Sequence, residues 1–304
     1  MLLKLSLYSL FASITLIVLA LVCYILVLTL GRSARRQQVN ARVAHPSAKA
    51  AGGRTTTSVL EQPVETAGPT ALAFTATRLS QLAFVFLTAS LVFRAFETGR
   101  GPFGNQYEFA AAFAWGMIGA YIYFEHRYHV RTLALVILPL TAAMLIYALS
   151  VGDIANPLPP ALQNSLLLTI HVLVAILAYG AFSVSFAAAG LYLIQPAEGR
   201  KGFPKPALLD QIGYRAVIIG FPLLTLVVVL GAVWAQIAWG RYWSWDPKET
   251  ASLLTWLIYG AYLHARVARG WVGRRASWLL ILGFAAVMFT FFGNLFFTGL
   301  HSYA

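Results

Sequence analysis

One short segment of the chain is unusually dense in tryptophan, which points to a binding function. Residues 234–250 read Trp-Ala-Gln-Ile-Ala-Trp-Gly-Arg-Tyr-Trp-Ser-Trp-Asp-Pro-Lys-Glu-Thr and contain four of the eight tryptophans. An aromatic belt at a membrane interface scatters Trp and Tyr over several helices rather than gathering them in one loop. Aromatic faces also stack on other flat groups. We therefore interpret Trp239, Tyr242, Trp243 and Trp245 as a platform for a flat apolar ligand.

Three histidines lie in or beside long apolar segments: His171, His264 and His301. Ionisable residues inside a membrane are costly and are functional candidates by default. A lone histidine can equally serve as an interhelical hydrogen-bond partner. At 1.5 Å per residue, His171 is expected about 10 Å from one end of its segment. His301 follows the last segment at that same end, whereas His264 closes its segment at the opposite end.

Two histidines at the level of an aromatic loop are typical of a haem site. Haem is flat and apolar, and its iron accepts two axial imidazoles. His171 and His301 are therefore the predicted iron ligands. A membrane b-type electron-transfer cytochrome is an alternative, but it would pair histidines at both faces, and the other level offers only His264. A haem-free permease would leave the aromatic loop unexplained.

The end of the aromatic segment also has a structural interpretation. Asp246-Pro-Lys-Glu249 matches a helix start, with Asp at the N-cap, Pro at the first helical position and Glu at the third. Asp246 is therefore a helix cap, a residue that orients an iron ligand, or both. Arg241 and Lys248 are the cations nearest the loop; they either pair with the propionates of haem or extend to the membrane surface.

The overall composition is that of a membrane protein. The chain is 59% hydrophobic and 11% charged, with a mean hydropathy of +0.72, whereas soluble domains carry about 25% charged residues. The net charge of +12 does not indicate nucleic acid binding, because the basic residues lie in short clusters between apolar segments. Cys23 is the only cysteine, so a disulfide within the chain and a cysteine metal site are both excluded.

Eight segments are long and apolar enough, or nearly so, to cross a bilayer, which needs about 20 residues. We expect an all-α polytopic bundle of about eight transmembrane helices. The segments are 5–30, 77–96, 108–124, 133–151, 165–194, 216–237, 251–265 and 278–300. The first is too long for a signal peptide, whose apolar region has about 7–15 residues, and is interpreted as a retained helix.

The distribution of basic residues predicts the orientation. We number the loops between the eight segments in chain order, so that odd-numbered and even-numbered loops lie on opposite sides of the membrane. Only five of the 22 Lys and Arg residues fall on the side of the even-numbered loops: Lys4, Arg94, Arg100, Arg241 and Lys248. Basic residues accumulate on the cytoplasmic side. Both termini and the aromatic loop are therefore expected outside.

The chain divides into four predicted parts. They are an N-terminal transmembrane helix (1–30), a flexible basic cytoplasmic linker (31–70), three transmembrane helices (71–164), and a haem-handling unit of four transmembrane helices (165–304) that carries the loop 234–250. The linker has too little apolar surface to build a core. His45, in this linker, and His126 and His129, in a later loop, are interpreted as solvated, since two histidines without a third ligand make a poor metal site.

The motif Trp239-Gly-x-Tyr-Trp-Ser-Trp-Asp-Pro-Lys-Glu-Thr250 resembles the tryptophan-rich WWD signature of haem-handling proteins in cytochrome c biogenesis. Its Ser-Trp-Asp-Pro-Lys-Glu-Thr ending is more similar to the CcsA (ResC) type, of System II, than to the CcmC and CcmF types. The segments around Trp256, Tyr259 and His264, and the terminal Gly-Leu-His-Ser-Tyr, resemble that family too. The resemblance covers about residues 165–304.

This resemblance implies a holocytochrome c synthase, a thioether-forming lyase, working with a CcsB (ResB) type membrane partner. His171 and His301 would hold haem at the outer face, and His264 would take part in haem uptake from the cytoplasmic side. We therefore assign His171, His301 and Asp246 as catalytic residues and His171, His264 and His301 as iron ligands. The predicted haem-binding set combines the three histidines and Asp246 with the aromatic platform.

The substrate implied by the resemblance is iron protoporphyrin IX (b-type haem), bound transiently and attached to the Cys-x-x-Cys-His motif of an apocytochrome c. A thiol-reducing partner outside the membrane is also implied, in a bacterial plasma membrane or a thylakoid equivalent. The alternative within the same group of proteins is a CcmC-like exporter or chaperone that delivers haem without attaching it.

Overall fold

The computed structural model describes residues 1–44, 70–152, 154, 165–200, 202–293 and 296–301. These residues form eight α-helices and one short 3-10 helix, η1, and contain no strand. The elements are α1 (Leu2–Ala44), α2 (Thr70–Thr98), α3 (Gln106–Tyr128), η1 (Arg131–Leu133), α4 (Ala134–Val151), α5 (Ser165–Leu193), α6 (Pro206–Trp239), α7 (Pro247–Arg269) and α8 (Arg274–Phe292). Each of the eight apolar segments thus contains a helix, although the last predicted segment, 278–300, is too long because α8 ends at Phe292.

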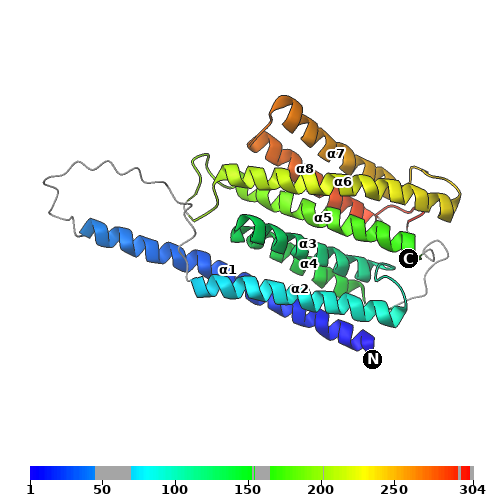
Figure 1. Cartoon of the computed structure of the whole chain (residues 1–304), viewed down its shortest axis with the longest axis horizontal. Coiled ribbons are helices and arrows are strands. Elements are labelled where there is room, and N and C mark those ends of the chain that lie inside the picture. Colours follow the sequence, from blue (N-terminus) through cyan, green and yellow to red (C-terminus); the bar gives the residue numbers. More distant parts are fainter. Residues whose placement is uncertain (45–69, 153, 155–164, 201, 294–295, 302–304) are drawn as a thin grey trace.

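The helices run alternately in opposite directions and pack as successive hairpins, from the α1–α2 pair to the α7–α8 pair (Figure 1). α5 lies near the centre, in contact with α3, α6 and α8. The N-terminus and the end of α8 lie at the same end of the bundle, as an even number of antiparallel helices requires. We call the other end, where α3 connects to α4 and α7 to α8, the basic end.

Six of the eight helices are long and apolar enough to cross a membrane by length and composition: α1, α2, α4 together with η1, α5, α6 and α8. The molecule is therefore a polytopic helical membrane protein. α3 and α7 do not reach this apolar composition within the described residues. α3 carries Glu108 and Glu125, both buried by its neighbours, and α7 begins and ends with charged residues. α3 is enclosed by α2, α4 and α5 and therefore needs less lipid-facing apolar surface, whereas α7 packs on α6 and α8 at the edge of the bundle.

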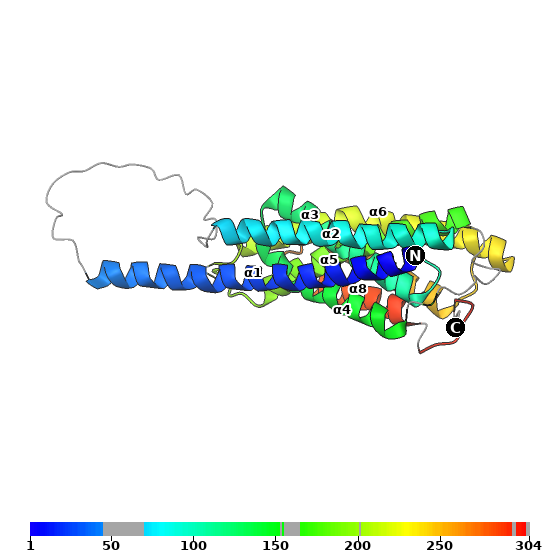
Figure 2. The same cartoon turned by 90° about the horizontal axis from the view of Figure 1, so that it is seen from below.

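α1 is longer than the sequence suggested. It continues to Ala44 and extends beyond the α2 start (Figure 2). The first part of the segment interpreted as a flexible linker is therefore helical, whereas residues 45–69 lie outside the described residues. The added stretch is rich in Ala, Arg and Gln, which have high helix propensity.

α3 and α5 approach each other so closely that their backbones touch. A Cβ added at Gly180 of α5 would meet the carbonyl oxygen of Gly116 in α3, and one added at Gly116 would come within 2.6 Å of the Ile176 carbonyl oxygen. Small residues permit such contacts in membrane proteins, where packing rather than the hydrophobic effect holds helices together. α3 and α5 therefore form one closely packed pair.

We expect Gly180→Ala to destabilise the protein by about 1–3 kcal/mol, because overpacking forces the two backbones apart. Gly190→Ala in the same helix is the matched control, since a Cβ there meets nothing within 4 Å. The measurement is the thermal unfolding midpoint of both variants in the same detergent. Equal midpoints would contradict a close α3–α5 contact.

Candidate functional site

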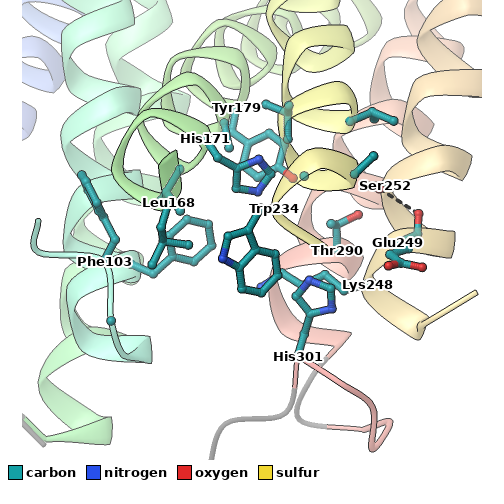
Figure 3. A pocket seen from close by; sticks show the side chains of 18 of the residues that line it. Phe103, Leu168, His171, Tyr179, Trp234, Lys248, Glu249, Ser252, Thr290 and His301 are labelled. Carbon is teal, nitrogen blue, oxygen red and sulfur yellow. Dashed lines mark hydrogen bonds between the residues drawn. The ribbon is translucent and has the colours of Figure 1, made fainter. Parts of the chain in front are cut away.

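A pocket lies at the end of the bundle opposite the basic end, which we call the pocket end (Figure 3). It is lined by the α2–α3 connection, by α3, α5, α6, α7 and α8, and by His301 beyond α8. His171, Tyr242, Trp243 and His301 are the predicted site residues that line it. The fold therefore brings together side chains that are up to 130 positions apart in the chain, from His171 to His301.

His171 projects into this pocket from α5 (Figure 3). Gly231 of α6 makes room for its ring, because a Cβ at that position would lie 3.0 Å from His171 Cε1. The ring interacts with the backbone of Val227 in α6, while its Nδ1 is buried and has no hydrogen-bond partner among the described residues. A buried ring nitrogen left unpaired in a pocket fits a metal ligand.

His301 is oriented by a carboxylate. Its Nδ1 lies 2.7 Å from Asp246 Oδ1. Burial, reinforced by the charge of Lys248, lowers the pKa of His301 although Asp246 opposes the shift. Burial alone would raise the pKa of Asp246, but the Lys248 N–H and His301 outweigh it and the pKa is lowered. At neutral pH a neutral imidazole therefore donates Nδ1–H to a carboxylate, the arrangement that presents Nε2 to a metal.

Asp246 performs both of the roles that the sequence left open. As the N-cap of α7 it accepts a hydrogen bond from Lys248 N at 3.0 Å, and Glu249 reciprocates by accepting from Asp246 N at 3.2 Å. Its Oδ2 accepts from Leu300 N at 2.6 Å. Gly299 is required beside it, because a Cβ there would lie 2.9 Å from Pro247 Cδ and against the carboxylate. One carboxylate thus fastens the segment of His301 to the start of α7.

The aromatic residues do not form a single flat platform. Tyr242 and Trp243 line the pocket together with Trp234, whereas Trp239 packs edge-on against His301, with ring centroids 4.8 Å apart. Trp245 is 69% exposed and has φ of +59°, in the left-handed region. The sequence shows that these residues are aromatic. The direction of each ring depends on the backbone torsion angles of the loop, which a sequence pattern does not predict.

His264 is not brought to the pocket. It is exposed on α7, and at 1.5 Å per residue it lies about 27 Å along the helix from Asp246. His126 and His129 are exposed at the basic end, in line with their interpretation as solvated residues. The described residues contain no group of three or more His, Cys, Asp or Glu placed to hold a metal ion.

One wall of the pocket was not anticipated from the sequence. Phe103, Gly104, Asn105, Gln106 and Phe109, from the α2–α3 connection and the start of α3, line it. The signal that could have found this wall is the charge cluster around it. Fully buried Glu108 accepts hydrogen bonds from Arg94 Nε at 2.8 Å, from Arg100 Nη1 at 2.8 Å and from Gly104 N at 2.6 Å. A buried carboxylate with two arginine partners fixes the connection against the bundle.

The two cations near the loop have different positions. Arg241 is exposed, as a residue extending to the membrane surface would be. Lys248 instead lines the pocket, so the interpretation as a surface cation is wrong for this residue. Burial lowers the pKa of Lys248 to about 8, partly opposed by Asp246, so its ammonium group is mostly protonated at neutral pH.

Comparison with known proteins identifies the group to which this chain is similar. The family described as "Cytochrome C assembly protein" matches residues 103–301, which extends beyond the 165–304 resemblance to include the pocket wall. The "Cytochrome c biogenesis protein CcsA" of Guillardia theta is 37% identical over 73% of this chain and 83% of its own length. Those of Synechococcus sp. (strain RCC307) and Prochlorococcus marinus (strain MIT 9312) are 35% and 36% identical, over 72% and 74% of this chain and 81% and 83% of their own lengths.

The match covers the pocket, both of its histidines and the aromatic loop. A role in cytochrome c maturation, with the handling of haem that this process requires, follows from it. The chain belongs to the cytochrome c assembly family and is a membrane protein of the cytochrome c biogenesis type named CcsA.

Proposed function

We infer that this chain is the membrane subunit of a cytochrome c synthase that moves haem outward and presents it for attachment to apocytochrome c. The observation that carries this proposal is that His171 and His301 line one pocket, the first with an unpaired buried nitrogen and the second held by Asp246. Two neutral imidazoles suit the axial positions of haem iron. Haem is the substrate in this scheme.

The chemistry requires positioning more than acid–base groups. Each cysteine thiol of Cys-x-x-Cys-His adds across one vinyl double bond: a sulfur–carbon bond forms at one vinyl carbon and a hydrogen is added to the other. The addition therefore needs no net oxidant. Holding the two reactants in a fixed arrangement can supply much of the rate enhancement. His171 and His301 would hold the iron, and Tyr242, Trp243 and Trp234 would pack on the porphyrin.

His264 is proposed as a separate haem contact, used before the pocket is reached. It is exposed near the basic end, where a partner of the CcsB (ResB) type would supply the second ligand. Basic loops face the cytoplasm, so this placement directs haem from His264 outward to the pocket end. In this scheme the pocket end faces the outer side of a bacterial plasma membrane or its thylakoid equivalent, where a thiol-reducing partner keeps the apocytochrome cysteines reduced.

A synthase and an exporter are distinguished by the bond that holds haem in the product. The chain and its partner are expressed with a Cys-x-x-Cys-His reporter in a host that lacks its own cytochrome c assembly proteins. We expect haem that stays on the reporter in a denaturing gel and resists acidic acetone, and loss of this haem in the His171→Ala/His301→Ala double variant. Reporter-bound haem that acidic acetone extracts would support delivery without attachment.

A further inference from the structure

The pocket is polar on one side and apolar on the other. α5 and α6 contribute mainly aliphatic side chains, among them Leu168, Val172, Val227 and Val228. The polar lining comes from the start of α3, from α7 and from α8: Asn105, Gln106, Lys248, Glu249, Ser252 and Thr290. Figure 3 shows Lys248, Glu249, Ser252 and Thr290 together, across the pocket from Phe103 and Leu168. A ligand with one charged edge and one apolar edge matches this division.

Lys248 is the only Lys or Arg among the residues that line the pocket, and no ion pair joins it to another described residue. The two nearby carboxylates are already engaged. Asp246 bonds to Lys248 N, Leu300 N and His301, and Glu249 accepts from Ser244 N at 2.8 Å and from Asp246 N. The ammonium group lies 5.4 Å from the ring centroid of Phe109 in α3. A partly buried cation that no carboxylate pairs directly favours an anionic ligand.

Gln106 is a second polar group of the pocket lining that lacks a partner. Its Oε1 is buried without a hydrogen bond to any described residue. Gln106 and Phe109 are three positions apart on α3 and therefore share a helix face, and Phe109 is the residue on which Lys248 lies. The amide of Gln106 can turn its NH₂ group toward a ligand. By contrast, the hydroxyls of Ser252 and Thr290 already bond to backbone carbonyls.

We propose that Lys248, assisted by Gln106, binds a propionate carboxylate of haem and thereby fixes how the porphyrin is rotated in its plane. This proposal rests on the function inferred above and adds the groups that orient the substrate. The propionates occupy one edge of protoporphyrin IX and the vinyl groups the other. Anchoring the propionates at Lys248 therefore directs the reactive vinyl edge away from the polar side. Lys248 is thus a positioning residue, distinct from the iron ligands.

The test compares haem with haem dimethyl ester, in which both propionates are uncharged. The full chain is purified in detergent and titrated with each compound, and binding is followed by absorption. We expect the wild type to bind haem about 10- to 100-fold more tightly than the ester, as one charge-assisted hydrogen bond would give. Lys248→Met should lose this preference by weakening only haem binding, Lys248→Arg should keep it, and Gln106→Leu should reduce it.

Arg241→Met is the matched control, since it removes an exposed cation of the same loop and should keep the preference. Equal affinity of the wild type for haem and ester would overturn the anchor while leaving the proposed function intact, and this comparison needs no variant to fold. An equal loss for both ligands in Lys248→Met would also overturn it. Failure of the wild type to bind either compound would instead overturn the proposed function and the anchor with it.

Discussion

His171→Ala and His301→Ala will each remove the low-spin haem spectrum that we expect of the purified wild-type protein. Each change deletes one axial ligand, and the two ligands come from different elements, α5 and the segment after α8. The affinity for haem should fall by more than about tenfold in each variant, because even the hydrogen-bond partners of metal ligands typically contribute 10- to 100-fold. The measurement is the absorption spectrum of oxidised and reduced protein, purified with and without its partner.

Two further variants make this result specific. Added imidazole should restore the low-spin spectrum of His171→Gly, since it can occupy the space of the missing ring and supply the ligand. His126→Ala, at the exposed basic end, should bind added haem as the wild type does. His264→Ala should also bind added haem at the pocket, about 27 Å away along α7. Unchanged haem content in the His171→Ala/His301→Ala double variant would refute the assignment of these ligands.

Asp246→Asn will separate the orientation of His301 from the capping of α7. Asparagine caps helices as well as aspartate does, so we expect the free energy of unfolding to change by no more than about 1 kcal/mol. The neutral amide is a weaker acceptor for His301 Nδ1–H, and its NH₂ group would oppose the N–H groups of Lys248 or Leu300. Haem affinity should therefore fall by about 10- to 100-fold, measured by titration beside thermal unfolding.

The comparison with alanine completes this series. Asp246→Ala removes the cap as well as the hydrogen bond to His301, and the lost cap costs about 0.5–2 kcal/mol of stability. If Asp246→Asn binds haem with wild-type affinity, the carboxylate acts on the helix start alone. If Asp246→Asn and Asp246→Ala lose stability and haem in the same proportion, the effect on haem is a consequence of local unfolding.

The sequence predicted the helices because length and apolarity determine which segments can lie in a bilayer. It also placed His171 and His301 at one level and His264 at the other, since depth along a helix follows from counting residues. Depth is one coordinate only. Lateral position depends on which helices pack together, and no local pattern encodes the approach of Lys248 in α7 to Phe109 in α3.

Loop geometry limited the rest of the prediction. The directions of Trp239 and Trp245 depend on two residues in the left-handed region, Gly240 at φ +74° and Trp245 at φ +59°. Such torsions follow from caps and tertiary contacts rather than from hydrophobic periodicity. The pocket wall at 103–109 was missed for a similar reason, because the connection that carries it has no periodic pattern and is held by ion pairs of the buried carboxylate of Glu108 with Arg94 and Arg100.

The backbone contact of Gly116 with Gly180 has a mechanical consequence for the pocket. It couples the wall at 103–109 and His171 into one body, since α3 carries the former and α5 the latter. His301 belongs to a second body, the start of α7, to which Asp246 ties it. The two imidazoles therefore belong to different packing units, so the distance between them depends on how the start of α7 packs relative to α5.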